Sequence, residues 1–143
     1  MNKLLLLSIA GILIVTSGCT SLQYQKLDKL PTVSEDKGLI YFFREKEFVG
    51  SMVSYYIYEG NEKLGGLQNG TFFYIEPTPG PHTYRAKTEA EEKVTINVVA
   101  GETYYVKAEV KMGLLCGQPD LTIVHELEGK SDIPNLKYAI IKK

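Results

Sequence analysis

The chain has 143 residues, which is enough for one domain and too few for two ordinary ones. Its formal net charge is -1, from 16 basic and 17 acidic residues, so it lacks the concentrated positive charge that nucleic-acid-binding proteins need. The ten tyrosines and the 44% of hydrophobic residues exclude a disordered chain and favour a folded domain rich in β-strands.

The first 18 residues have the pattern of a signal peptide. Lys3 supplies a positive charge, residues 4–15 are apolar apart from Ser8, and small residues follow up to Cys19. The uncharged stretch of about 15 residues is shorter than the roughly 20 that a membrane-spanning helix requires. We therefore expect residues 1–18 to form a signal helix that is removed from the mature protein.

Cys19 indicates which kind of signal peptide this is. The segment resembles a bacterial lipoprotein signal, in which small residues precede a cysteine, although Thr16 stands where leucine is usual. A cysteine thiol is a strong nucleophile, so Cys19 is the expected site of lipidation. The resemblance implies several acyl chains, palmitate among them, which together anchor a protein stably to a membrane. The alternative is an ordinary secretory signal or a short anchor helix.

The residue after the cysteine bears on location. Thr20 is not the aspartate that is typical of lipoproteins retained in an inner membrane. We therefore expect a cell-envelope protein on the outer membrane, facing the periplasm.

The mature chain is expected to contain a tether, one domain and a tail. Residues 19–36 are polar, lack periodicity and include Pro31, which predicts a lipidated N-terminus followed by a flexible tether. Residues 37–127 contain short runs rich in Val, Ile, Tyr, Phe and Thr, separated by turn residues, which predicts β-strands. The pattern leaves open the conformation of the C-terminal tail, residues 128–143.

The strands of the domain are predicted in chain order. Residues 39–44 are apolar on both faces, which is typical of a strand covered on both sides. Residues 64–67 contain two glycines and predict an edge strand or a bulge. Asn69-Gly70 predicts a hairpin turn. The other expected strands are residues 52–58, 71–75, 82–88, 94–98, 103–111 and 121–125.

This spacing predicts an all-β fold. About seven or eight strands, with a turn roughly every ten residues, favour an antiparallel β-sandwich, and a small β-barrel is the alternative. We expect no amphipathic helix after the signal helix.

Residues 103–111 alternate most regularly. Tyr104, Val106, Ala108 and Val110 are expected to face the core. Tyr105, Lys107 and Glu109 point to the opposite face. An aromatic ring beside two charges can contact a partner, so we expect these three residues to form a partner-binding surface.

Groups that could perform catalysis are few and dispersed. His82 and His125 stand alone, whereas a metal site needs three or four ligands, so we predict no metal and no cofactor. No motif of an activated nucleophile is present, and we predict no catalytic residues. If Cys19 is lipidated, Cys116 has no intramolecular disulfide partner. It follows Leu114-Leu115 and is expected to be buried and inert.

Several segments resemble the bacterial "domain of unknown function 2846" family. They are residues 38–44, 48–51, 67–73, 79–82, 87–90, 101–107 and 111–113. The resemblance covers roughly residues 35–125, and many members of that family look like lipoproteins, which agrees with Cys19. It implies no activity, because the family name records none. Residues 70–82 are also similar to PEGA and carboxypeptidase-regulatory-like sandwich modules, which are mostly accessory modules.

These observations favour a membrane-anchored, non-catalytic binding module. Its expected partners are the membrane, through the lipid on Cys19, and an unidentified envelope protein, peptide or glycan, but no nucleic acid. The alternative is a structural or assembly accessory of an envelope complex, for which a long uncovered edge strand would be typical. A hydrolytic enzyme is the third hypothesis, and it lacks an assembled nucleophile or metal cluster.

Overall fold

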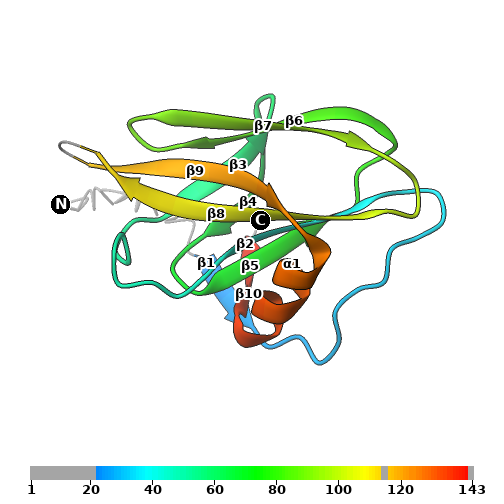
Figure 1. Ribbon diagram of the computed structural model, residues 1–143, viewed down its shortest axis with the longest axis horizontal. Coiled ribbons are helices and arrows are strands. Elements are labelled where there is room, and N and C mark those ends of the chain that lie inside the picture. The colour runs from blue at the N-terminus through cyan, green and yellow to red at the C-terminus, as the bar shows by residue number, and fades with distance from the viewer. Residues whose placement is uncertain (1–21, 114–115, 142–143) are drawn as a thin grey trace, which may run out of the picture.

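The computed structural model describes residues 22–113 and 116–141, which form two β-sheets packed face to face (Figure 1). The larger sheet contains, in spatial order, β1 (Leu22–Gln25), β10 (Lys137–Ile141), β5 (Thr71–Ile75), β2 (Leu39–Arg44), β8 (Thr103–Met112) and β9 (Gly117–Val124). The smaller sheet contains β4 (Glu62–Leu67), β3 (Tyr55–Glu59), β6 (Gly80–Lys87) and β7 (Glu91–Val98). The predicted signal peptide, Cys19 and Leu114-Leu115 lie outside the described residues.

The β-sandwich prediction is confirmed, with two differences in detail. Most neighbouring strands are antiparallel, but β2 pairs with β8 in parallel, and so does β5 with β10. The described chain forms ten strands, because β1 and β10 add to the predicted set. The prediction of an edge strand or a bulge for residues 64–67 is confirmed, because β4 lies at the edge of the smaller sheet and Leu64 is an extra residue between the pairs Ile57–Gly65 and Tyr58–Lys63.

The strand β2 lies at the centre of the molecule and is buried along its whole length. Ile40 and Phe42 face the core between the sheets, where Phe42 meets the edge of the Tyr84 ring. Tyr41 and Phe43 face the other side, in a second apolar cluster outside the larger sheet. The apolar character of both faces of residues 39–44 is thereby explained.

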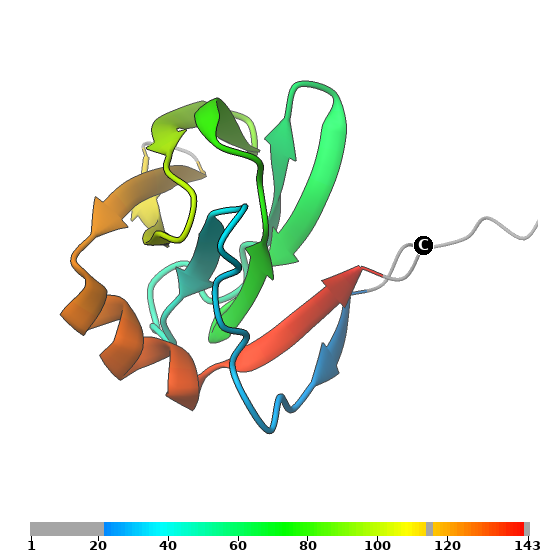
Figure 2. The same ribbon diagram turned by 90° about the vertical axis from the view of Figure 1, so that its right-hand side faces the viewer.

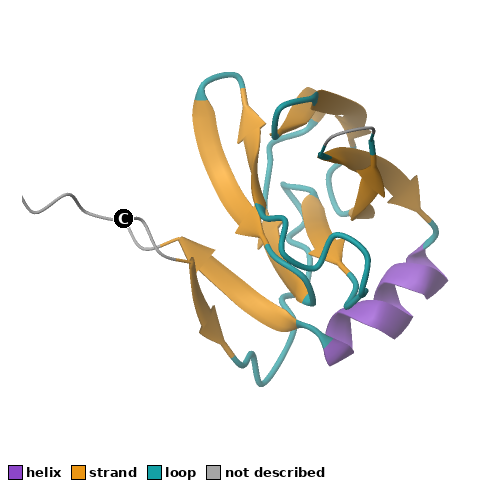
Figure 3. Ribbon diagram, turned by 90° about the vertical axis from the view of Figure 1, so that its left-hand side faces the viewer, coloured by secondary structure: helices purple, strands orange, loops and turns teal. Residues whose placement is uncertain are grey.

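A short helix follows β9, contrary to the expectation of an all-strand domain. The helix α1 (Glu126–Asp132) continues into a 3₁₀ turn, Ile133–Asn135, and both pack against the outside of the larger sheet (Figure 3). Only Gly129 of α1 is buried, so the helix has no apolar stripe that the sequence could reveal. Within the described residues no helix is long and apolar enough to cross a membrane.

The segment predicted as a flexible tether packs onto the domain from residue 22 onward. The strand β1 pairs with β10, from Leu22 opposite Ile141 to Gln25 opposite Tyr138. Residues 26–38, here called the strap, then cross the outer face of the larger sheet beside the C-terminal elements (Figure 2). The tether prediction is therefore wrong for residues 22–36, and the domain extends beyond residue 127 to include β10.

Three apolar residues hold the strap in place. Leu27, Leu30 and Val33 pack against the outer apolar cluster. The Tyr41 hydroxyl donates a hydrogen bond to the Pro31 carbonyl at 3.1 Å. The outer face of the larger sheet is therefore covered by the strap on one side and by α1 with the 3₁₀ turn on the other.

Candidate functional site

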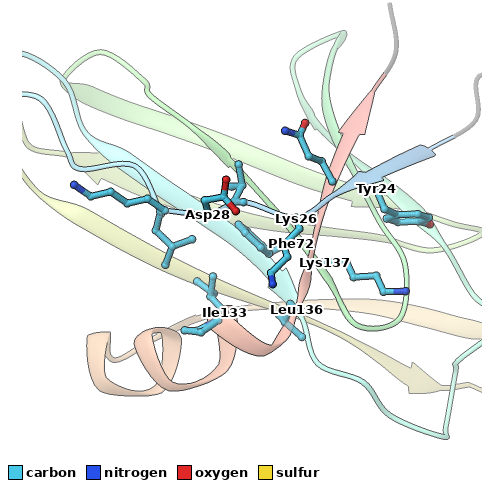
Figure 4. Close-up of a pocket in the computed structure, with 12 residues that line it drawn as sticks. Tyr24, Lys26, Asp28, Phe72, Ile133, Leu136 and Lys137 are labelled. Atoms are coloured by element: carbon cyan, nitrogen blue, oxygen red, sulfur yellow. The ribbon is translucent and has the colours of Figure 1, made fainter.

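A groove of about 690 Å³ opens between the start of the strap and the C-terminal elements (Figure 4). Its floor is apolar and is formed by Leu27, Leu30, Phe72, Ile133 and Leu136. Phe72 and Ile133 are buried in the outer cluster, and the three leucines are half-buried. The floor therefore belongs to the packed core of the outer face and has a fixed shape.

The rim of the groove is basic. Lys26 and Lys29 of the strap and Lys137 of β10 line it, and all three are exposed. None of them takes part in an ion pair with another described residue. Asp28 is the one acidic residue in the lining, so three lysines and one aspartate give the rim a formal charge of +2. Figure 4 shows Lys26, Phe72 and Leu136 close together, with the Lys137 side chain extending to the other side of β10.

A second hollow of about 400 Å³ lies on the other side of Leu30 and Ile133, which line both spaces. Here the strap, β2, β8 and α1 contribute, and the Tyr41 and Tyr105 rings form part of the wall. The two hollows lie next to each other along the strap, separated by Leu30 and Ile133, and are here together called the depression.

The predicted partner-binding face of β8 lies beside this depression but under α1. Tyr105 points away from the core between the sheets, as expected, but it is only 5% exposed. Its ring stacks on Tyr41 at a centroid distance of 5.5 Å, and Gly129 of α1 lies directly against it. The prediction that Tyr105 is an exposed contact residue is therefore wrong, because a helix that the sequence did not reveal covers it.

Lys107 and Glu109 belong to a cluster of charges at the edge of α1. The Lys107 Nζ atom lies 2.8 Å from Glu45, 3.1 Å from Glu128 and 3.8 Å from Glu109. The hydrogen bond with Glu45 raises the pKa of Lys107 above its usual range, and the same bond lowers the pKa of Glu45. Burial, together with the Glu45 carboxylate, raises the pKa of the neighbouring Asp132. Lys107 thus joins α1 to the larger sheet.

The two histidines are each held by local hydrogen bonds. His82 lies in β6, with Nδ1 2.6 Å from a Glu59 carboxylate oxygen and Nε2 2.8 Å from the Thr78 carbonyl. His125 is exposed, and its Nδ1 atom caps α1 by accepting a hydrogen bond from the Leu127 amide. The described part of the chain holds no group of three His, Cys, Asp or Glu side chains that could bind a metal ion.

Cys116 is half-exposed, so the prediction of burial is wrong. Its thiol donates a hydrogen bond to the Glu89 carboxylate at 3.1 Å. That hydrogen bond raises the pKa of the thiol and so lowers the fraction of reactive thiolate.

Arg44, the last residue of β2, has a structural role that the sequence pattern does not reveal. It is 3% exposed and donates hydrogen bonds of 2.5 Å to the carbonyl oxygens of Gly50 and Val53. These bonds fix the loop between β2 and β3, which presents Phe48 and Met52, each 95% exposed.

The sequence pattern does not reveal the groove, because it predicts a flexible tether over residues 19–36, which include most of the strap. One signal was present. Leu27, Leu30 and Val33 recur at every third position, which is unusual in a solvated linker. The partners of these residues, Phe72 and Ile133, lie far away in the sequence, so their contact could not be inferred from the pattern.

The described geometry defines a small all-β sandwich protein with a ligand-sized groove outside its larger sheet. The family model "Protein of unknown function (DUF2846)" matches residues 34–118, more than half of the chain, and the chain belongs to this family. This confirms the resemblance seen in the sequence. A protein of Haemophilus influenzae, described as uncharacterized, is 26% identical over 140 residues, which cover 93% of this chain and 83% of that protein. No solved structure matches the chain significantly.

Proposed function

We propose that this protein is a lipid-anchored, non-catalytic binding module of the bacterial cell envelope, and that the groove beside the strap is its binding site. The observation that carries this proposal is the groove. Its volume of about 690 Å³ lies within the range of roughly 300–1,000 Å³ that is typical of ligand pockets. It also combines an apolar floor with a few charged groups at the rim, which is the usual composition of such sites.

The signal-peptide pattern and Cys19 support the anchoring part of the proposal. The strand β1 begins at Leu22, three residues after Cys19. Three extended residues span at most about 10 Å, so a lipid on Cys19 would hold the domain close to the bilayer. Thr20 supports the outer membrane, facing the periplasm.

The separation of the reactive side chains supports a non-catalytic role. His82, His125 and Cys116 lie on different elements, and each has its own hydrogen-bond partner. Acid–base or nucleophilic catalysis needs two or more such groups within hydrogen-bond reach of one another.

Assembly by strand addition is the second candidate function. The strand β1 is the outermost strand of the larger sheet on its side, and three of its four residues are exposed. The described part of β1 offers an added strand four residues to pair with. The longer edge strands, β7 and β9, have eight residues each and lie against one another, so the groove has stronger support.

Site-specific photocrosslinking in intact cells tests the groove as a binding site. A benzophenone amino acid is placed at Pro134, an exposed residue of the groove lining. The matched control carries it at Leu127, which is 75% exposed on α1 and lines neither hollow. We expect a light-dependent adduct on the mature protein from position 134 only. No adduct, or the same adduct from both positions, would contradict the proposal.

A further inference from the structure

We infer that the groove binds an anionic phospholipid of the membrane that holds the protein, with an acyl chain on the apolar floor and the anionic headgroup at the lysines of the rim. This inference rests on the proposed function, because it assigns a ligand class to the same site.

The charge of the rim selects an anionic group. Lys26 and Lys137 come from different segments, the strap and β10, and both line the same hollow. Both are exposed and form no ion pair within the described parts of the chain, so their ammonium groups are free to bind a ligand. Lysine is a common ligand of phosphate groups. The formal charge of +2 at the rim, Lys29 and Asp28 included, favours a lipid with a net negative charge over a zwitterionic one.

The floor of the groove selects an acyl chain. Leu30, Phe72, Ile133 and Leu136 present only carbon atoms from their side chains, and so would leave the hydroxyl groups of a glycan without partners. An acyl chain has no such groups and gains from removal of its surface from water. An apolar floor under a basic rim therefore fits an amphiphile with an anionic head.

The groove lies close to the lipid anchor, so the membrane is the nearest source of this amphiphile. Tyr24 and Gln25 line the groove and lie five and six residues after Cys19. Six extended residues span at most about 20 Å, so the groove of the anchored protein cannot lie far from the lipid headgroups. The lipid nearest to the site is a phospholipid of the same bilayer.

The test uses the mature lipoprotein with the photoreactive residue at position 134, inserted in nanodiscs made from equal amounts of phosphatidylglycerol and phosphatidylcholine. Mass spectrometry identifies the lipid adducts formed in light. We expect phosphatidylglycerol adducts to exceed phosphatidylcholine adducts by on the order of tenfold, since each lysine near a membrane surface favours an anionic lipid. In the Lys26→Glu/Lys137→Glu variant this ratio should fall to about one or below.

The matched control is Lys46→Glu/Lys87→Glu, which makes the same change in charge at two exposed lysines that do not line the groove. This control should keep the preference for phosphatidylglycerol. Equal adducts of both lipids in the unmodified protein, or a preference that survives Lys26→Glu/Lys137→Glu, would overturn the inference. A peptide or glycan adduct at position 134 in cells would also overturn it while leaving the proposed function intact. The absence of any adduct in cells would contradict the proposed function itself.

Discussion

Gly129 is the residue at which α1 rests on the larger sheet. A Cβ atom at this position would lie 2.1 Å from Cδ1 and 2.4 Å from Cγ of Tyr105, and this ring is stacked on Tyr41 and cannot easily move. Alanine ordinarily stabilises a helix by about 1 kcal/mol relative to glycine. We expect the clash to outweigh this gain, so that Gly129→Ala lowers the free energy of unfolding by about 1–3 kcal/mol.

Urea unfolding followed by circular dichroism measures this effect. Ser131→Ala is the control, because Ser131 is an exposed residue of the same helix and alanine should raise stability there slightly. A Gly129→Ala variant as stable as the unmodified protein would show that α1 does not pack on Tyr105 as described.

Lys107 gives the charge cluster a defined pH dependence. The pKa of Glu45 is lowered, so this carboxylate stabilises the fold above its ordinary pKa of about 4.3, and its contribution is lost as the pH falls. The pKa of Lys107 is raised, so its contribution is present below about pH 10.4 and is lost as the pH rises through its folded-state pKa. The ion pair therefore stabilises the protein from about pH 5 to about pH 10.

We expect Lys107→Met to lower the free energy of unfolding by about 1 kcal/mol at pH 7, and by less at pH 3, because the stabilisation by the Glu45 carboxylate is lost as the pH falls. Urea unfolding at the two pH values provides the measurement. Lys46→Met, at an exposed lysine that forms no ion pair within the described residues, should show no such difference. An effect of Lys107→Met that is the same at both pH values would contradict an electrostatic role.

These residues also show how far alternation predicts a site. The outward direction of Tyr105, Lys107 and Glu109 followed from the period of two residues in a strand, and the structure confirms it. That α1 covers this face could not be predicted, because this helix is seven residues long and Gly129 is its one buried residue. Alternation specifies the face of a sheet, but it carries no information about what packs on that face.

At the scale of elements, β10 joins the N-terminal segment to the rest of the larger sheet. It lies between β1 and β5. Its Tyr138 ring stacks on the Tyr74 ring at a centroid distance of 5.5 Å, and the centroid of the Phe72 ring lies 5.6 Å away. We expect Tyr138→Ala to cost about 2 kcal/mol, because a half-buried aromatic ring is lost. It should also loosen β1, because β10 is the described strand with which β1 pairs.

Hydrogen exchange followed by mass spectrometry tests this coupling. In Tyr138→Ala, the amides of β1 should exchange faster than in the unmodified protein, while those of β6 and β7 in the smaller sheet should change little. Tyr138→Phe keeps the ring and serves as the control. Unchanged exchange in β1 would mean that β10 does not hold it.

The sequence pattern does not predict the strands β1 and β10. They are four and five residues long, and they pair with each other across most of the chain's length. In contrast, β2 and β5 matched their predicted bounds, because each is a dense apolar run between clear turn residues. Short strands stabilised by distant partners leave little local pattern.

In the molecule as a whole, the segments at both ends of the described chain pack together at the larger sheet, where β1 pairs with β10. The strap comes from the N-terminal side and α1 with β10 from the C-terminal side, and the groove lies between them. The β-sandwich was predictable because its strands recur through the middle of the sequence. The groove was not, because it forms only where the two end segments pack together.

We propose that the protein works at a membrane surface, held there by lipid on Cys19. Intact-mass spectrometry of the protein extracted from its native envelope tests this proposal most directly. We expect a polypeptide that begins at Cys19 and carries acyl chains, and we expect Cys19→Ser to leave the uncleaved, unlipidated precursor. A mature protein without lipid, or one cleaved at another residue, would contradict the proposal.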